Sequence, residues 1–525
     1  MTSQRPTGEP VDDSVRETQG DPQARDLQFD TAHLRSDLSR RTVRGAALTL
    51  GSHTVRFLLE TTRIIVLARL LSPVDYGLVA MVTVVTGLIA MFQDLGLQMP
   101  TLTRRRITHP EVSTLFWINV GVGVALVLVV IAVAPLLAWF YDEVRLVPIA
   151  IVLAPTFLIA GFTVQHQALL QRQMRFGALS TIAILSSAGG LAVGIPMAYS
   201  GAGYWALVGM SMTSVATNAG AVWVACGWRP GRPVRGVEVR EMIRFGSHVT
   251  GTNLVGYLSR RLDHALVGWW WGAIPLGLYT KANSLVEAPM TRALSSMGSV
   301  TVPSLSSLAD RPERYRGAYL RILTMLALAL MPAAAFLVGT AQLLIPFLLG
   351  PRWVEAAPIF GALAVLTFVA PVDGSSLLLF LTQNRAREAL RWSLVRGLLT
   401  GVAVVAGLPW GGLGVAAALA VSGLIRTPLL IWCVTRHGPV RAADIYRTLV
   451  TPALASILAL VALLVLAPRA AGIAAAPALT GGLVVTGVVV LAVLAVVPSG
   501  RGALLDAWAA LRLLRRQRDG QSGRP

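Results

Sequence analysis

Charged side chains recur inside long apolar stretches of this 525-residue chain. Arg56, Glu60 and Arg63 follow i, i+4 and i+7 spacing, which places them on one face of a helix. A second apolar stretch carries two arginines, an aspartate and a histidine within residues 260–264. An ionisable group in the middle of a membrane costs about 2.5–3.5 kcal/mol, so such groups usually face a water-filled cavity or a partner. These two stretches are therefore candidates for a binding site inside an apolar body.

The charged residues within the predicted helices divide into candidate binding residues and candidate coupling residues. The predicted contacts to an anionic headgroup are Arg56, Arg63, Arg260, Arg261, Lys281 and Arg292. The predicted coupling or gating residues are Glu60, Asp94, Asp263 and Glu287. Structural ion pairs should balance, so the excess of bases predicts a cavity that receives an anion, and guanidinium groups suit phosphate through bidentate hydrogen bonds. The alternative is helix pairing or extension toward the membrane surface, and it is favoured for Arg69, Arg396 and Arg426.

A shift of the sequence by 200 residues aligns the two charged stretches without gaps. Identical residues 200 positions apart include Arg44 and Arg244, Gly51 and Gly251, Val55 and Val255, Leu58 and Leu258, Gly77 and Gly277, and Leu78 and Leu278. The shift also sets Glu60 opposite Arg260 and Arg63 opposite Asp263. If the two helices face each other across a pseudo-twofold axis, these pairs are predicted to close the cavity in one state and to open in another. Parallel repeats of this kind occur in transporters that rock two halves about a central cavity.

The composition is that of a membrane protein. Hydrophobic residues make up 54% of the chain and charged residues 14%, whereas about 25% of a soluble protein is charged. At about 20 residues per span, the apolar residues suffice for about 14 membrane-spanning helices. The fold class predicted is an all-α polytopic membrane protein. The predicted helices are 44–71, 76–99, 114–140, 145–168, 176–199, 202–226, 241–270, 275–302, 319–348, 355–382, 390–409, 412–436, 447–467 and 474–497.

The basic residues orient these helices. Three arginines fall in the predicted outer loops, namely Arg145, Arg352 and Arg469, and most of the other basic residues fall on the opposite side. Because cytoplasmic loops carry an excess of basic residues, both termini are predicted to be cytoplasmic. The formal net charge of +19 then lies mainly at the membrane surface, where it meets anionic lipid rather than nucleic acid.

The predicted organisation is two six-helix repeats around a central cavity, followed by two extra helices. The segments are a disordered cytoplasmic tail at 1–42, an N-terminal half at 43–226, a cytoplasmic linker at 227–243, a C-terminal half at 244–436, two additional helices within 437–498, and an amphipathic basic tail at 499–525.

Several kinds of chemistry are not supported by the sequence. Lys281 is the only lysine and follows Thr280, whereas a Walker A loop needs a glycine before its lysine, so the chain does not carry its own ATPase site. The two cysteines, Cys226 and Cys433, are too few for a disulfide framework or a cysteine-based zinc site. We therefore expect no catalytic residue, metal or cofactor.

Six short segments resemble motifs of the Wzx-like polysaccharide transporters, lipid-linked oligosaccharide flippases of the multidrug/oligosaccharidyl-lipid/polysaccharide (MOP) superfamily. The segments lie between about residues 42 and 436 and are ARLLSPVDYGLVAM at 68–81, FQDLGL at 92–97, YLSRRLD at 257–263, LGLY at 276–279, VPSLS at 302–306 and LGPRW at 349–353. One departure is visible. The family usually carries amides where Arg261 and His264 stand here, which makes the predicted cavity more basic.

The resemblance implies a flippase that moves undecaprenyl-diphosphate-linked repeat units across the bacterial cytoplasmic membrane, for exopolysaccharide, capsule or O-polysaccharide synthesis. The implied partners are the lipid-linked oligosaccharide and membrane lipids, with a polysaccharide polymerase and glycosyltransferases as further candidates. A lipid II flippase of the MurJ type and a multidrug exporter of the same superfamily remain alternatives. A membrane polymerase or glycosyltransferase is a third, although the predicted outer loops leave no room for a catalytic domain.

Overall fold

The computed structural model describes residues 55–93, 96–104, 107–234, 254, 256–258, 260–308, 310–470, 473–497 and 500. Within these residues the secondary structure is helical, without a strand. The predicted tail at 1–42, the linker beyond residue 234, the basic tail after residue 500 and Asp94 lie outside the described residues. The side chain of Arg292 also lies outside them.

The first set of helices precedes the linker. It comprises a helix over residues 55–70, α3 (Pro73–Ala90), α4 (Gln98–Thr103), α5 (His109–Tyr141), α6 (Leu146–Leu153), α7 (Pro155–Gly161), α8 (Val164–Arg172), α9 (Phe176–Tyr199) and α10 (Tyr204–Cys226). The start of α3 is set locally, because the Ser72 N–H and hydroxyl both donate to the Asp75 carboxylate, at 2.9 and 2.6 Å. Pro73 occupies the first helical position, where no N–H is needed.

The second set follows the linker. It comprises a helix that includes residues 260–271, α12 (Ala273–Ser306), α13 (Pro312–Leu349), η4 (Pro351–Trp353), α14 (Ala356–Thr382), α15 (Ala386–Gly407), η5 (Leu408–Trp410), α16 (Gly411–Thr435), α17 (Ala442–Leu466), η6 (Ala467–Ala470) and α18 (Ala475–Val496).

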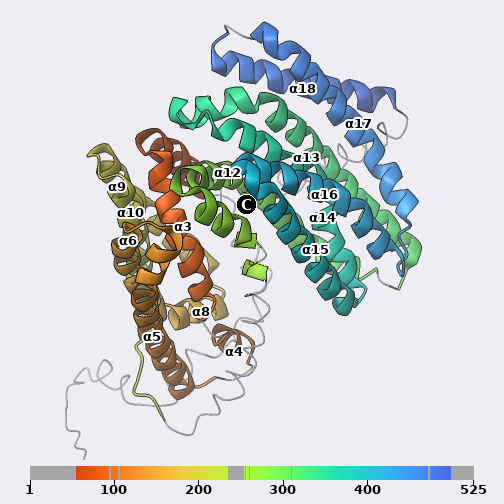
Figure 1. Ribbon diagram of the computed structural model, residues 1–525. Coiled ribbons are helices and arrows are strands. Elements are labelled where there is room, and N and C mark those ends of the chain that lie inside the picture. Colours follow the sequence, from red (N-terminus) through yellow and green to blue (C-terminus); the bar gives the residue numbers. More distant parts are fainter. Residues whose placement is uncertain are drawn as a thin grey trace, which may run out of the picture.

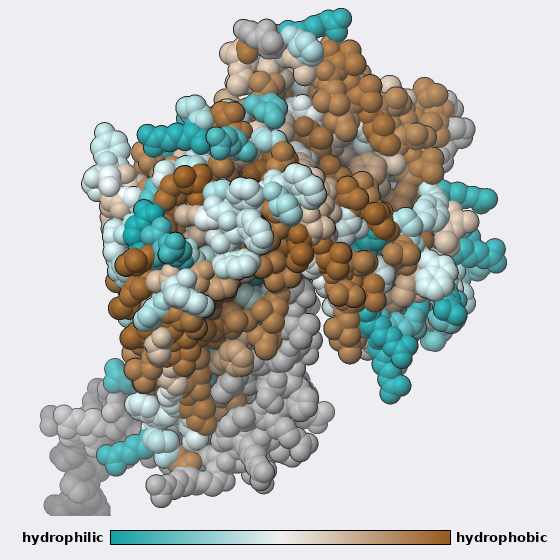
Figure 2. Space-filling view, in the orientation of Figure 1, coloured by the Kyte–Doolittle hydropathy of each residue, from teal (hydrophilic) through white to brown (hydrophobic). Residues whose placement is uncertain are grey.

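The helices form two arms that meet near α3 and α12 and diverge from there (Figure 1). One arm contains α5–α10, and the other contains α13–α16, with α17 and α18 packed against α13 on its far side (Figure 1). A buried apolar cluster joins the arms where they meet and includes Leu78, Phe157, Tyr279, Trp353 and Phe360. Figure 2 shows that the surface is hollowed between the diverging arms and that apolar residues cover much of their flanks.

Nine helices among the described residues are long and apolar enough to cross a membrane, or ten if the bent stretch from α6 to α8 is one span. The nine include α15 and α16 as one stretch, Arg387–Thr435, although the two helices pack against each other at Gly407 and Gly414. The all-α polytopic fold is thus confirmed, whereas the number fourteen stays a prediction. α12 is absent from the nine, and its sequence includes Lys281 and Glu287.

Two predicted helices differ from those in the structure. The helix predicted over 145–168 is divided into α6, α7 and α8, with a bend of 41° before α8. Pro155 begins α7 and has no N–H to continue the hydrogen bonding of α6. The helix predicted over 76–99 ends at Ala90, and Gly96 beyond it has φ +70°, a left-handed conformation that interrupts a helix.

Candidate functional site

Two glycines bring α3 and α12 into backbone contact where the arms meet. A Cβ atom on Gly77 would lie 1.8 Å from the Ala273 carbonyl oxygen, and one on Gly277 would lie 1.9 Å from the Pro73 carbonyl oxygen. Only glycine permits such an approach. The 200-residue shift relates both the glycines and the carbonyls they face, so the two helices contact each other through equivalent positions.

A second contact between the arms, here named the Trp353 seam, joins the end of helix 55–70 to α13 and η4. The buried Trp353 indole donates its Nε1–H to the Ala68 carbonyl oxygen at 2.7 Å, and its ring meets that of Tyr76 edge to face at 5.3 Å. Arg69 donates to two carbonyl oxygens in the last turn of α13, at 2.6 and 3.2 Å. These bonds satisfy carbonyls that a helix end leaves unpaired.

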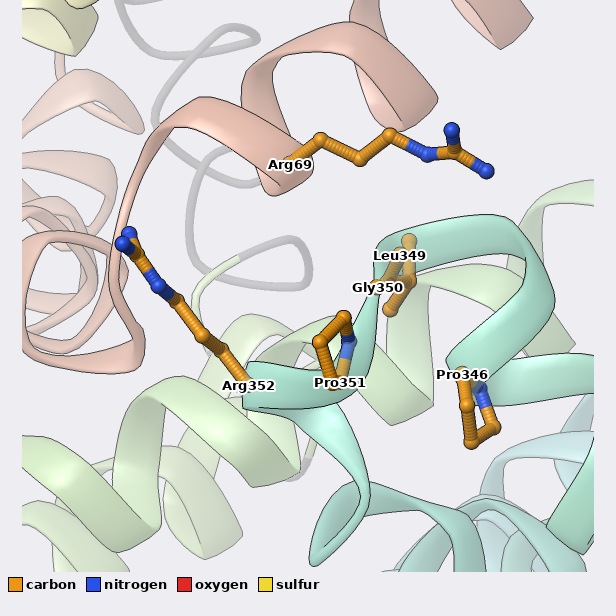
Figure 3. Close-up of a pocket in the computed structure, with 6 residues that line it drawn as sticks. All are labelled: Arg69, Pro346, Leu349, Gly350, Pro351 and Arg352. Carbon is orange, nitrogen blue, oxygen red and sulfur yellow. The ribbon is translucent and has the colours of Figure 1, made fainter.

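A pocket of about 410 Å³ lies at the Trp353 seam. It is lined by Arg69, Pro346, Leu349, Gly350, Pro351 and Arg352 (Figure 3). The two arginine side chains extend in different directions, Arg69 over the end of α13 and Arg352 to the other side (Figure 3). Their guanidinium groups do not converge on one point, so the pocket is not an evident anion site.

Three of the predicted residues gather beside the seam. The Lys281 side chain is 6% exposed, and its Nζ lies 4.2 Å from the centroid of the Tyr76 ring, a cation–π geometry. Lys281 also interacts electrostatically with Arg63 and Glu60, which form an ion pair on helix 55–70. These residues, Lys281, Arg63 and Glu60, are here named the Lys281 cluster. The cluster contains two basic groups and one carboxylate.

The predicted residues 260–264 form a hydrogen-bonded chain with Tyr279 of α12. The Asp263 carboxylate accepts bonds from the His264 backbone N–H and Nδ1, both at 2.8 Å, and from the Tyr279 hydroxyl at 2.7 Å. The other His264 ring nitrogen, Nε2, lies 3.3 Å from Nη1 of Arg261. His264 is only 2% exposed, whereas Arg261 is partly exposed. The chain thus leads from a buried aspartate to a guanidinium at its more exposed end.

A third group of charges occupies the arm that contains α14–α16. Arg426 of α16 donates to the Asp373 carboxylate at 2.8 Å, and both side chains are largely buried. Arg396 of α15 interacts electrostatically with this pair and with Arg260. Arg260 and Arg396 are exposed, and the structure describes no ion pair for either one. This group, here named the Arg426 group, therefore contains three bases, Arg260, Arg396 and Arg426, and one acid, Asp373.

The remaining predicted residues are placed separately. Arg56 is exposed near the start of the described part of helix 55–70, one turn before Glu60. Glu287 of α12 accepts a bond from Asn283 at 3.3 Å. Among the described residues, no group of three potential metal ligands lies together.

The ion pairs predicted between the halves are not the ones that form. Glu60 binds Arg63 on its own helix, and Asp263 binds His264 and Tyr279. The two predicted pairs are therefore absent from this conformation, and their formation in another state stays a prediction. An alignment of two helices gives depth in the membrane but not the rotation of each helix. Helix pairing was one of the two roles favoured for Arg426, and in the structure Arg426 of α16 pairs with Asp373 of α14. A single aspartate inside an otherwise apolar predicted span was the available signal.

Residues 66–358 match the model of a family described as "Polysaccharide biosynthesis protein". The chain belongs to this polysaccharide biosynthesis protein family. The match covers more than half of the chain. It includes the Trp353 seam, Lys281 and the hydrogen-bonded residues Arg261, Asp263, His264 and Tyr279, whereas Glu60 and Arg63 precede it.

Curated relatives of this polysaccharide biosynthesis protein come from several bacteria. It is 28% identical over 326 residues to the teichuronic acid biosynthesis protein TuaB of Bacillus subtilis (strain 168), covering 61% of this chain and 67% of TuaB. It is 23% identical over 402 residues to the lipopolysaccharide biosynthesis protein WzxC of Escherichia coli (strain K12), covering 75% and 80%. The succinoglycan biosynthesis transport protein ExoT of Rhizobium meliloti (strain 1021) is 22% identical over 378 residues, covering 71% and 76%.

The fold is similar to that of solved flippases and transporters. The lipid II flippase MurJ in an inward-closed conformation aligns with a TM-score of 0.68 at 12% identity, over 86% of this chain and 98% of MurJ. An inward-facing multidrug resistance MATE transporter of the MOP superfamily aligns with a TM-score of 0.57 at 17% identity, over 74% and 95%. At these identities the similarity establishes the fold and nothing further.

Proposed function

We propose that this protein is a flippase that moves undecaprenyl-diphosphate-linked oligosaccharides across the bacterial cytoplasmic membrane by alternating access. The observation that carries the proposal is the excess of basic over acidic side chains inside the apolar body. The Lys281 cluster has two bases for one acid, and the Arg426 group has three bases for one acid. A diphosphate can supply the missing negative charge, because guanidinium groups bind phosphate oxygens through paired hydrogen bonds.

The positive-inside rule orients the molecule, with both termini in the cytoplasm. The Trp353 seam then faces outward and is closed, and the hollow between the arms opens toward the cytoplasm (Figure 2). In this state the diphosphate and sugars enter between the arms from the cytoplasmic side, while the lipid tail stays in the bilayer. Arg63, Arg260 and Arg261 replace water around the diphosphate, and Lys281 contributes its charge from the closed end.

Transport requires that the two arms rock, so that the Trp353 seam opens as the cytoplasmic side closes. The two moving halves are the segments 43–226 and 244–436. The two additional helices after them move together with α13. A membrane potential that is negative inside drives an anion outward, by about 2.3 kcal/mol per charge at 100 mV. Two diphosphate charges that cross the whole field would contribute about 4–5 kcal/mol.

The test is deletion of the gene in its own host, followed by complementation with single variants. Deletion is expected to abolish surface polysaccharide and to accumulate lipid-linked oligosaccharide on the cytoplasmic face. Arg63→Ala and Arg260→Ala are expected to lower export at unchanged protein levels, since each removes a charge at the proposed site. Arg145→Ala is the matched control, because Arg145 pairs with Glu143 at the surface, outside the site.

Other outcomes distinguish the remaining candidates. Export at the wild-type level in both Arg63→Ala and Arg260→Ala would contradict the proposed site. Accumulation of lipid II would indicate a flippase of the MurJ type. Unchanged glycolipids together with greater drug sensitivity would indicate a multidrug exporter.

A further inference from the structure

His264 can exist in only one protonation state in the hydrogen-bonded chain of this structure. Arginine has donors but no acceptor, so the Nε2 atom that faces Arg261 at 3.3 Å must present a lone pair. Aspartate accepts, so Nδ1 must carry the hydrogen that points to Asp263 at 2.8 Å. Both contacts together select the neutral ring with its proton on Nδ1.

A second proton on this ring changes the contact with Arg261. Protonation at Nε2 replaces the acceptor by a donor that faces another donor, on a group that is also positively charged. The Asp263 side of the ring is unaffected, because Nδ1–H continues to donate to the carboxylate. The contact that is lost is therefore the one between His264 and Arg261, and the partly exposed guanidinium is released.

The surroundings favour Nε2 as the place where a proton is gained. The Asp263 oxygens already accept three hydrogen bonds, from the His264 N–H, its ring and Tyr279. The titratable and charged groups in contact with His264 are Asp263 and Arg261 on its own helix and Tyr279 on α12. Beyond them, Glu287 of α12 interacts electrostatically with Tyr279, and Arg396 of α15 interacts with Arg260. Nε2 of His264, by contrast, has one long contact, with Nη1 of Arg261 at 3.3 Å, and is the acceptor in these hydrogen-bonded residues that can most readily take up a proton.

From this geometry we infer that His264 is the proton site of the transporter, and that a proton on Nε2 releases Arg261 to bind the anionic headgroup. The inference rests on the proposed function and adds to it a proton-binding residue that controls the binding of the headgroup. The proton comes from water between the arms and converts the imidazole to imidazolium, with no other bond broken. By linkage, an anion bound to Arg261 favours the protonated ring to the same extent that the proton favours the anion.

The test uses the purified full-length protein in detergent and UDP-glucose as a soluble diphosphate diester, whose phosphates gain no proton near neutral pH. Binding is measured by titration calorimetry between about pH 5.5 and pH 8, the range in which histidine titrates. The wild-type affinity is expected to rise about 5-fold or more as the pH falls across this range, with proton uptake on binding. His264→Gln keeps a polar side chain that does not titrate, and it is expected to bind with a flat pH profile and without proton uptake.

Two further variants separate this role from a structural one. Arg261→Gln is expected to lose both affinity and pH dependence although His264 is intact. His437→Gln is the control, since His437 is exposed far along the chain beside Glu388 and should leave the profile unchanged. The same pH profile in the wild type and His264→Gln would overturn the proton site alone. Failure of the wild type to bind the probe at any pH would overturn the proposed function as well.

Discussion

The indole Nε1 of Trp353 lies 2.7 Å from the carbonyl oxygen of Ala68, in a fully buried hydrogen bond between residues 285 positions apart. This bond joins the end of helix 55–70 to η4, and Arg69 makes a second connection to the last turn of α13. The Trp353 seam is thus held by directional bonds to backbone carbonyls rather than by ion pairs. Such bonds break together when the two arms separate, which suits a closure with two discrete states.

Trp353→Phe is expected to weaken the Trp353 seam. The change leaves the buried Ala68 carbonyl without its donor, at a cost of about 1–3 kcal/mol, while the aromatic packing against Tyr76 is largely kept. The thermal unfolding midpoint of the protein in detergent should fall. Trp139→Phe is the matched control, because Trp139 is 78% exposed, and an equal fall in both variants would argue against a special role for the bond.

Gly277→Ala is expected to push α3 and α12 apart where they cross. The new methyl group would lie 1.9 Å from the Pro73 carbonyl oxygen, and overpacking of this kind costs about 1–3 kcal/mol. Since the contact exists in the closed state, the population should shift toward an open Trp353 seam. A cysteine placed at Leu349, which is buried at the Trp353 seam, should then react faster with a membrane-impermeant thiol reagent. Gly121→Ala is the control, because no atom lies within 4 Å of its Cβ position, and equal labelling of both variants would refute the prediction.

Arg426→Gln is expected to destabilise the arm that contains α14–α16. Removal of one partner of a buried ion pair leaves the other charge uncompensated, at a cost of about 3–5 kcal/mol. A surface pair is worth about 0–1 kcal/mol, so Arg145→Gln should change the unfolding midpoint little. The double variant Arg426→Gln with Asp373→Asn should recover part of the loss. No recovery would mean that the pair does not act as a unit.

Lys281→Met is expected to lower transport without lowering the stability of the protein. The methionine fills a similar volume beside Tyr76 without the cost of a buried charge, so the unfolding midpoint should stay unchanged or rise. Export of the lipid-linked oligosaccharide should fall, because the closed end of the cavity loses its cation. Parallel measurements of thermal unfolding and export check this, and a variant that loses stability without losing export would place Lys281 among the structural residues.

Much of this molecule follows from local sequence patterns. Long apolar stretches determine the helices, and the predicted ranges 176–199 and 355–382 agree closely with α9 and α14. The type of charge on each helix is also readable, since an arginine inside an apolar stretch stands out whatever surrounds it. Ser72, Pro73 and Asp75 set the start of α3 locally, three residues before the predicted start at Tyr76, because a capping box involves only neighbouring residues.

The partners of the charges were decided by tertiary structure alone. The sequence by itself determined that Glu60, Asp263 and Asp373 lie in apolar helices, but not that they meet Arg63, Tyr279 and Arg426, respectively. Partner choice depends on the rotation of each helix about its axis and on which helices cross, and both are set by packing between distant segments. The approach of Gly77 to Ala273 is one such contact, because only the close crossing of α3 and α12 brings Tyr279 and Lys281 to the site.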